Sequence, residues 1–250
     1  MGRLSRREKR ALREEGLMDM NNNVVAHPKF NVKRIYPKTH NQQRTFDAFV
    51  AGKNLFLHGS AGTGKTFLSL YLTLDELINR NVTNKKKIYI VRSTVPSRDM
   101  GFLPGNQKEK MKVYEAPYES ICAELFGRGD AYNILKTKVQ IEFISTSFIR
   151  GTTLDDCFVI VDECQNFNAM ELHSVMTRAG ENCTFIFCGD VKQDDLTSER
   201  KREYSGLAEF LTVIKHMGMF ELIEFQPEDI VRSALVKQYI IAREKLGLSA

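Results

Sequence analysis

The stretch from Gly59 to Thr66 has the residue types and spacing of a phosphate-binding loop. It matches the pattern G-x-x-x-x-G-K-[ST] at every position. Glycines at these positions let backbone N–H groups wrap phosphates at the positive end of the helix that follows. Lys65 is expected to reach the terminal phosphates, and the Thr66 hydroxyl to coordinate Mg²⁺. The residues expected to hold the nucleotide are Gly59, Ser60, Ala61, Gly62, Thr63, Gly64, Lys65 and Thr66.

Two acids follow an apolar run farther along the chain. Phe158–Val161 is apolar, and Asp162 and Glu163 come directly after it. The carboxyl end of a buried parallel strand lies beside the ligand-binding crevice of an open α/β sheet. Asp162 is therefore expected to hold Mg²⁺ through its water shell, and Glu163 to orient and deprotonate an attacking water. Because P-loop kinases of small molecules usually lack the second acid, Glu163 favours hydrolysis.

A third apolar run, Phe185–Cys188, leads into Gly189 and Asp190, with Gln193 shortly after. If its strand lies beside the strand that ends at Asp162, then Gln193 or Asp190 would sit near the γ-phosphate. An amide at that point can distinguish ATP from ADP, because only ATP presents the extra oxygens. The alternative is a strand followed by a simple Gly-Asp turn.

Upstream of the loop, Gln42 and Gln43 stand side by side. A glutamine amide can read the Hoogsteen edge of adenine with one acceptor and one donor. The alternative is an exposed pair of glutamines on a helix. The residues themselves leave both interpretations open.

The elements that must position these residues alternate between strands and helices. The expected strands are Asn54–His58, Lys87–Val91, Val139–Ile144, Cys157–Val161, Thr184–Cys188 and Phe220–Glu224. The expected helices are Lys65–Asn79, Gln107–Phe126 with a break before Pro117, Ala169–Arg178, Ser205–His216 and Pro227–Lys245. This alternation implies right-handed βαβ units and a mostly parallel sheet with helices on both faces. The sequence predicts one α/β domain over residues 39–250.

Positive charge is concentrated near the start of the chain. The 250 residues carry a formal net charge of +5, from 36 Lys and Arg and 31 Asp and Glu. Residues 1–44 contain eleven basic residues and four acids, so this stretch carries +7 and the remainder −2. Residues 1–38 are predicted to be a partly flexible basic arm. Two interpretations stay open for it: electrostatic capture of nucleic acid, or a solvated tail or oligomer clasp.

Several classes of protein are disfavoured. The charged start has no apolar run behind it, so no secretory signal is expected. Arg6 stands where a myristoylation signal has Ser or Thr, and no apolar stretch is long enough to span a bilayer. Among the five cysteines, Cys157, Cys183 and Cys188 lie in or beside apolar runs, and no Cys-x-x-Cys pair occurs. They are expected to be small buried hydrophobes in a reducing compartment, so a cytoplasmic protein is predicted.

Together these segments resemble the PhoH-like family of P-loop ATPases of bacteria and their phages. The core of that family is similar to the first RecA-like domain of superfamily-one helicases. The resemblance covers residues 39–243, and Cys164 stands where the family has a small Ala. Beyond the phosphate-binding loop, the matching segments are Gly101–Gly105, Phe148–Leu154, Asp162–Asn166, Thr177–Gly180, Gly189–Gln193, Ser205–Leu207 and Asp229–Arg232.

The resemblance implies a RecA-like P-loop NTPase fold and ATP hydrolysis with Mg²⁺, the loop and the two acids having the roles given above. It implies that Gln42 reads adenine. It also makes Arg178 and Arg232 candidates for a charge-neutralising arginine finger. Arg92 and Arg150 would instead face nucleic acid. For each arginine, a surface or interface salt bridge is the alternative.

The predicted function is Mg²⁺-dependent ATP hydrolysis coupled to RNA or single-stranded DNA. Helicases of the resembled superfamily close two RecA-like domains around ATP, and this chain has room for one. A homo-oligomer, such as a hexameric ring in which a neighbour supplies the finger, is therefore expected, with no membrane partner. Two alternatives remain: a nucleotide-dependent switch or assembly ATPase acting on a protein partner and, less favoured, a small-molecule P-loop kinase.

Overall fold

The computed structural model describes residues 30–93, 107–149, 151–190 and 206–246. The compact unit that carries the site extends over Val32–Ala250. Val32 is hydrogen-bonded to the side chain of Asn79, and the Lys33 N–H donates to the Leu125 carbonyl at 2.8 Å. Residues 32 and 33 therefore lie against the core, while the predicted division into arm and domain at residue 38 stays a prediction.

A six-stranded sheet forms the centre of this unit, and every neighbouring pair of strands is parallel. Its order is β3-β2-β4-β5-β1-β6. The strands are β1 (Asn54–Gly59), β2 (Lys87–Arg92), β3 (Ile141–Ser145), β4 (Cys157–Asp162), β5 (Cys183–Gly189) and β6 (Phe220–Phe225). The predicted parallel α/β sheet is confirmed. Because β5 lies between β1 and β4, the carboxyl ends of all three strands meet at one edge of the sheet.

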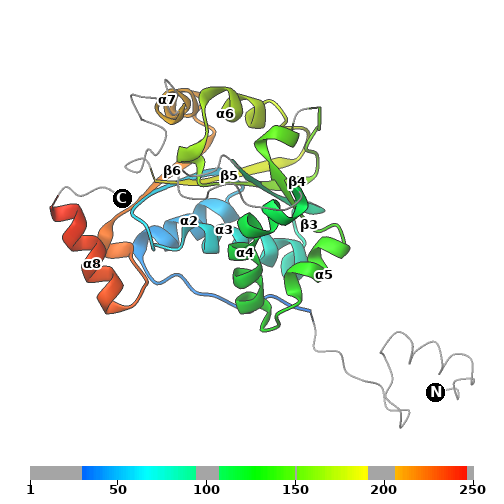
Figure 1. Ribbon diagram of the computed structural model, residues 1–250. Helices are drawn as coiled ribbons and strands as arrows, with labels where there is room; N and C mark the ends of the chain where they lie inside the picture. Colours follow the sequence, from blue (N-terminus) through cyan, green and yellow to red (C-terminus); the bar gives the residue numbers. More distant parts are fainter. Residues whose placement is uncertain (1–29, 94–106, 150, 191–205, 247–250) are drawn as a thin grey trace, which may run out of the picture. The chain divides into compact units, whose positions relative to one another are not determined.

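Helices cover both faces of the sheet (Figure 1). They are α2 (His40–Val50), α3 (Lys65–Leu74), which continues as a π-helical stretch (Asp75–Arg80), α4 (Gln107–Phe126), α5 (Ala131–Thr137), α6 (Ala169–Met176), α7 (Leu207–Met217) and α8 (Ala234–Lys245). In Figure 1, α6 and α7 lie above the sheet and α2 to α5 lie below it. Among the described residues, none of the helices combines the length and apolar content that a bilayer crossing needs.

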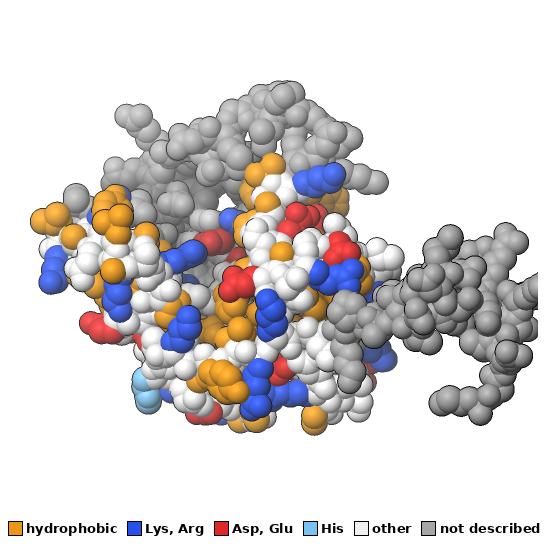
Figure 2. Space-filling view, turned by 90° about the horizontal axis from the view of Figure 1, so that it is seen from below, with side chains coloured by type: hydrophobic (Ala, Val, Ile, Leu, Met, Phe, Trp, Pro, Cys, Tyr) orange, Lys and Arg blue, Asp and Glu red, His pale blue; other side chains and the backbone are white. Residues whose placement is uncertain are grey.

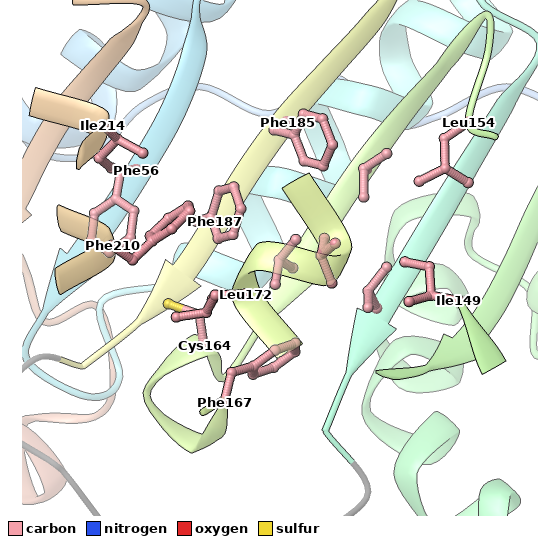
Figure 3. Close-up of a cluster of buried hydrophobic side chains, with 14 of the residues drawn as sticks. Phe56, Ile149, Leu154, Cys164, Phe167, Leu172, Phe185, Phe187, Phe210 and Ile214 are labelled. Atoms are coloured by element: carbon pink, nitrogen blue, oxygen red, sulfur yellow. The ribbon is translucent and has the colours of Figure 1, made fainter. Parts of the chain in front are cut away.

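A cluster of buried apolar side chains joins the sheet to α6 and α7 (Figure 3). Phe56 on β1 and Phe187 on β5 face Phe210 on α7, and the Phe187 and Phe210 ring centroids are 4.8 Å apart. Such aromatic pairs contribute about 0.5–1.5 kcal/mol beyond the area they bury. Leu172 attaches α6 to the same cluster. This packing fixes the positions of β4 and β5, which carry the acidic residues.

The predicted break of helix α4 before Pro117 is wrong, because the helix runs through this residue. Proline removes one backbone hydrogen bond and normally kinks or breaks a helix interior. Here the helix buries Tyr118, Cys122 and Leu125 completely. Full burial of a leucine alone stabilises the structure by about 1.5–3 kcal/mol, so the three buried side chains together offset the cost of the proline, about 3 kcal/mol.

The predicted helix Pro227–Lys245 is also wrong at its start. A short 3₁₀ helix, Pro227–Asp229, comes first, and α8 begins only at Ala234. The Asp229 carboxylate accepts hydrogen bonds from the Gln226 N–H and from the Asn41 side chain, both at 2.8 Å. These bonds hold the first turn against α2, so the chain that follows crosses the phosphate-binding loop before it becomes helical.

Candidate nucleotide-binding site

The phosphate-binding loop connects β1 to α3 at the carboxyl edge of the sheet. Gly59 ends β1 with φ +113°, and a Cβ atom there would lie 2.0 Å from the Phe225 carbonyl oxygen on β6. This position therefore requires glycine both for its backbone conformation and for the close approach of β6. Within the loop, the Thr63 hydroxyl donates to the Ser60 carbonyl at 3.0 Å, and both side chains are buried. The loop is thus held in one shape by its own residues.

Lys65 extends back into the loop from the first turn of α3. Its ammonium donates to the carbonyls of Gly59 at 2.6 Å and Ser60 at 2.9 Å. Burial lowers the pKa of Lys65, while the nearby carboxylates of Asp190, Glu163 and Asp162 oppose this change. The amine therefore lies inside the loop, where a phosphate oxygen could replace a carbonyl as its partner.

Asp162 lies at the end of β4 and is almost fully buried. The Thr66 hydroxyl donates to one carboxylate oxygen and the Tyr118 hydroxyl to the other, both at 2.8 Å. Burial and the neighbouring Glu163 raise the pKa of Asp162, against the hydrogen bonds of Thr66 and Tyr118 and the charge of Arg92. A buried carboxylate beside a hydroxyl is an oxygen donor set that suits Mg²⁺. Thr66 and Asp162 therefore fit the predicted cation.

Replacement of Asp162 by Asn is expected to stabilise the nucleotide-free protein at neutral pH. Because the folded-state pKa of Asp162 is raised, the stability linked to this group is present at low pH and is lost as the pH rises through the folded value. The neutral amide avoids that loss, by roughly 1 kcal/mol, which corresponds to about 2–4 °C in melting temperature.

Thermal unfolding of both proteins between pH 5 and pH 8, with a chelator and without nucleotide, measures the effect. The difference is expected to shrink toward acid pH. A variant that melts below the wild type at pH 8 would show that the hydrogen bonds to the carboxylate outweigh its burial.

Glu163 follows directly with a left-handed backbone, φ +52° and ψ +46°. A residue other than glycine in this region stores strain of about 1–3 kcal/mol, which is typical of functional sites. The Gln165 amide donates to Glu163 Oε2 at 2.6 Å, and Gln165 Oε1 accepts from the Asp190 N–H at 3.1 Å. The Gln165 side chain thus links the proposed base to the end of β5, as the expected proximity of β4 and β5 allows.

Gln165 and Tyr118 were not predicted as site residues. Gln165 stands in the segment Asp162–Asn166, which the family resemblance already marked, so a signal for it was present. Tyr118 carried no such signal, because its contact with Asp162 appears only when α4 packs against the sheet. Gly189, at the end of β5, permits the approach of this segment, since a Cβ there would lie 2.5 Å from Cys164 Sγ.

Gln42 lies on α2 and is buried against the phosphate-binding loop. Its Nε2 donates to the Thr63 carbonyl at 3.3 Å, and its Oε1 accepts from the Lys38 N–H at 2.8 Å. The neighbouring Gln43 is exposed and donates to Asp47. The alternative of two exposed glutamines therefore holds for Gln43 only. That Gln42 reads adenine stays a prediction.

The change Gln42→Ala is expected to weaken ATP binding about tenfold, which corresponds to the loss of one or two hydrogen bonds. GTP binding should weaken less, because guanine presents a different edge to the amide. Titration of both nucleotides against the variant measures the ratio, with Gln43→Ala as the matched control. Equal losses for ATP and GTP would mean that Gln42 only supports the loop.

Two of the four predicted arginines lie at the carboxyl edge of the sheet. Arg232 crosses the loop, and its Cγ is 3.1 Å from the place of a Cβ on Gly62. The Val231 N–H, next to it, donates to the Gly62 carbonyl at 3.3 Å. Arg92 ends β2 in register with Asp162, and its guanidinium lies 5.6 Å from the ring centroid of Tyr114. Arg92 thus borders the acidic residues, and its predicted role toward nucleic acid stays a prediction.

Arg178 is not brought to this edge. It follows α6 and precedes β5, so it lies near the amino end of the sheet, where its carbonyl accepts from the Leu154 N–H at 2.9 Å. Its Nε is buried and has no hydrogen-bond partner among the described residues. Gln193 and Arg150 lie outside the described residues.

The fold and site together define the P-loop NTPase fold with a RecA-like parallel sheet, of the kind found in terminase cores. The large terminase of a thermophilic bacteriophage, solved in complex with ADP, is one such structure. It matches with a TM-score of 0.51 and 12% identity, over 81% of this chain and 49% of that chain. The chain belongs to the PhoH-like protein family, whose model matches residues 34–244. The family resemblance predicted from the sequence is therefore confirmed.

Bacterial relatives align over most of the chain. A PhoH-like protein of Mycobacterium leprae is 33% identical over 84% of this chain and 58% of its own length. The PhoH-like protein of Bacillus subtilis is 34% identical over 85% of this chain and 65% of its own length. Protein PhoH of Escherichia coli K12 is 33% identical over 75% of this chain and 52% of its own length. The chain thus spans between about half and two thirds of the length of these relatives.

Proposed function

We propose that this protein is an Mg²⁺-dependent ATPase that couples ATP hydrolysis to the binding or remodelling of RNA or single-stranded DNA. The observation that carries the proposal is the convergence of Thr66 and Asp162, with Glu163 next in the chain. These residues come from α3 and from the end of β4, which are far apart in sequence. Their meeting at the phosphate-binding loop is what phosphoryl transfer to water requires.

Each residue has a separate task in the proposed reaction. Backbone N–H groups of the loop bind phosphate oxygens, and Lys65 exchanges its carbonyl partners for the terminal phosphates. Thr66 and Asp162 would hold Mg²⁺, which neutralises charge on the phosphates when it is bound. The Glu163 carboxylate takes a proton from the attacking water through Oε1, since Oε2 is held by Gln165. Gln165 fixes the direction in which this carboxylate points.

The nucleic-acid partner is supported mainly by charge. Residues 1–44 carry +7, and the remaining residues carry −2. The surface visible in Figure 2 has Lys and Arg side chains interspersed with Asp and Glu. A basic segment releases counterions when it neutralises phosphates, so binding through it should weaken steeply with added salt. The proposal therefore assigns most of the nucleic-acid affinity to the first part of the chain.

ATP hydrolysis with and without single-stranded RNA or DNA tests this coupling. The protein's mass is measured by light scattering on the same sample, because a homo-oligomer is also proposed. Stimulation by nucleic acid that falls with salt, together with a multimeric mass, is the expected result. A chain lacking residues 1–31 loses seven basic residues and four acids, which is +3 of the +7, and tests that part of the basic segment. ATPase activity indifferent to nucleic acid would instead favour a switch acting on a protein partner.

A further inference from the structure

Cys157 and Cys183 stand side by side at the amino edge of the sheet. They are the first residues of β4 and β5 and are register partners in this parallel pair. Their Sγ atoms are 3.7 Å apart. Neighbouring strands lie about 4.8 Å apart, and disulfides span Cα separations of about 4.4–6.8 Å. The two thiols can therefore be joined by a small movement of the strand ends.

The two thiols differ in exposure and in acidity. Cys157 is fully buried, whereas Cys183 is partly exposed. The hydrogen bond between them, with burial adding to it, raises the pKa of Cys157. The same bond lowers the pKa of Cys183, burial opposes this, and the charge of Lys85 lowers it further. Cys183 is thus suited to attack as a thiolate, with Cys157 as its neighbouring partner.

Several charged groups lie near the two thiols. The Lys85 ammonium donates to the carbonyl and the side-chain oxygen of Asn182, at 2.6 Å and 2.8 Å. It also lies 5.3 Å from the ring centroid of Phe158. Asp155 opposes the effect of Lys85 on Cys183, while Lys86 and Asp156 form an ion pair with each other at 2.7 Å. Lys85 is therefore a buried cation anchored close to the two sulfurs.

The other three cysteines are more deeply buried than Cys183, and burial outweighs the charge of Lys65 beside Cys188. Cys122, Cys164 and Cys188 are buried. Burial raises the pKa of Cys122 to about 12 and raises those of Cys164 and Cys188 as well. Because the thiolate is the reactive form, these three thiols should react slowly. These three thiols therefore serve as an internal reference for the reactivity of Cys183.

We propose that Cys157 and Cys183 form a reversible redox dithiol that hydroperoxides oxidise to a disulfide. In the first step, the Cys183 thiolate attacks one oxygen of hydrogen peroxide. An S–O bond forms, the O–O bond breaks and hydroxide leaves, which gives a sulfenic acid. In the second step, Cys157 sulfur attacks Cys183 sulfur. The S–S bond forms, the S–O bond breaks, and the departing hydroxide takes the Cys157 proton to become water. A dithiol reductant reverses the change by exchange.

This site is distinct from the nucleotide-binding site. At about 3.3 Å per residue, Cys157 lies roughly 16 Å along β4 from Asp162. The disulfide would join the amino ends of the two strands whose carboxyl ends carry Asp162 and Asp190. The sulfurs must approach from 3.7 Å to bond, and a dithiol reductant can separate them again by exchange. The pair is therefore suited to reversible oxidation.

To test this, the folded 250-residue chain is treated with graded hydrogen peroxide, its free thiols are blocked with N-ethylmaleimide, and its peptides are mapped by mass spectrometry. The expected product has lost two hydrogen atoms, contains a Cys157–Cys183 disulfide and retains the other three thiols. Dithiothreitol should restore the starting mass. Cross-links distributed over several cysteines, or Cys183 oxidised to sulfinic acid with Cys157 still free, would overturn the proposal.

Variants show whether disulfide formation depends on the Cys157–Cys183 pair and on Lys85, or only on how exposed each thiol is. Cys157→Ser and Cys183→Ser should each lose the disulfide, whereas Cys122→Ser should keep it. Lys85→Arg should retain fast alkylation of Cys183, and Lys85→Met should slow it severalfold at pH 7 and shift its pH profile upward. If Lys85→Met fails to fold, the pH dependence of alkylation at Cys183 and Cys122 in the wild-type chain tests the assignment instead. A Cys183 that titrates no lower than Cys122 would contradict the assignment.

Discussion

Glu163→Gln is expected to reduce ATP hydrolysis by roughly 10²–10⁴-fold, the usual contribution of a general base. The amide has the shape of the carboxylate but cannot accept a proton from water. ATP affinity should change little, because neither the loop nor the pair of Thr66 and Asp162 is altered. Steady-state phosphate release measures the rate, and a filter-binding or fluorescence titration measures ATP affinity.

Glu209→Gln is the matched control for this experiment. Glu209 is exposed on α7, so its replacement removes one negative charge without touching the loop or β4. It should hydrolyse ATP at the wild-type rate. If Glu163→Gln also did so, the base would have to be another residue, and the strained backbone of Glu163 would need another explanation.

Arg232→Ala carries the second large expected effect. An arginine that reaches the transferring phosphoryl group accelerates the reaction by about 10³–10⁵. Of the two finger candidates, the structure brings Arg232 and not Arg178 beside the phosphate-binding loop, with its Cγ 3.1 Å from the place of a Cβ on Gly62. We therefore expect Arg232→Ala to lose most turnover at saturating ATP, and Arg178→Ala to retain it within a fewfold.

Mixing experiments distinguish an arginine of the same chain from one supplied by a neighbour. Lys65→Ala and Arg232→Ala subunits are each expected to be inactive, and a mixture should remain inactive if each chain uses its own Arg232. The opposite result would be a nearly active Arg232→Ala variant, together with recovery of activity when Lys65→Ala is mixed with Arg178→Ala. Arg178 of a neighbouring chain would then be the arginine finger. That outcome would support the finger in trans that was expected from the single RecA-like domain.

The parts of the site that could be predicted from the sequence are formed by short runs of consecutive residues. The loop Gly59–Thr66 and the pair Asp162–Glu163 each combine a local pattern with a flanking apolar strand. Their positions follow because the carboxyl ends of parallel strands share an edge. The strands were predicted for the same reason, since buried parallel strands are nearly continuous apolar runs.

The parts that could not be predicted depend on packing between distant elements. Tyr118 reaches Asp162 only because α4 continues through Pro117, which local propensity opposes. Arg232 approaches Gly62 because Asp229 is bound to Asn41, which holds the start of the C-terminal segment at α2. Neither contact has a spacing or composition that marks it in advance.

The most direct test of the proposed activity is phosphate release from ATP by the purified 250-residue chain with Mg²⁺. Three samples are compared, each with RNA, with single-stranded DNA and without nucleic acid: the wild type, the wild type with excess chelator, and Lys65→Ala with Mg²⁺. Steady turnover is expected in the first sample and near-background rates in the other two. Turnover that persists in Lys65→Ala, or none in the wild type with either RNA or single-stranded DNA present, would contradict it.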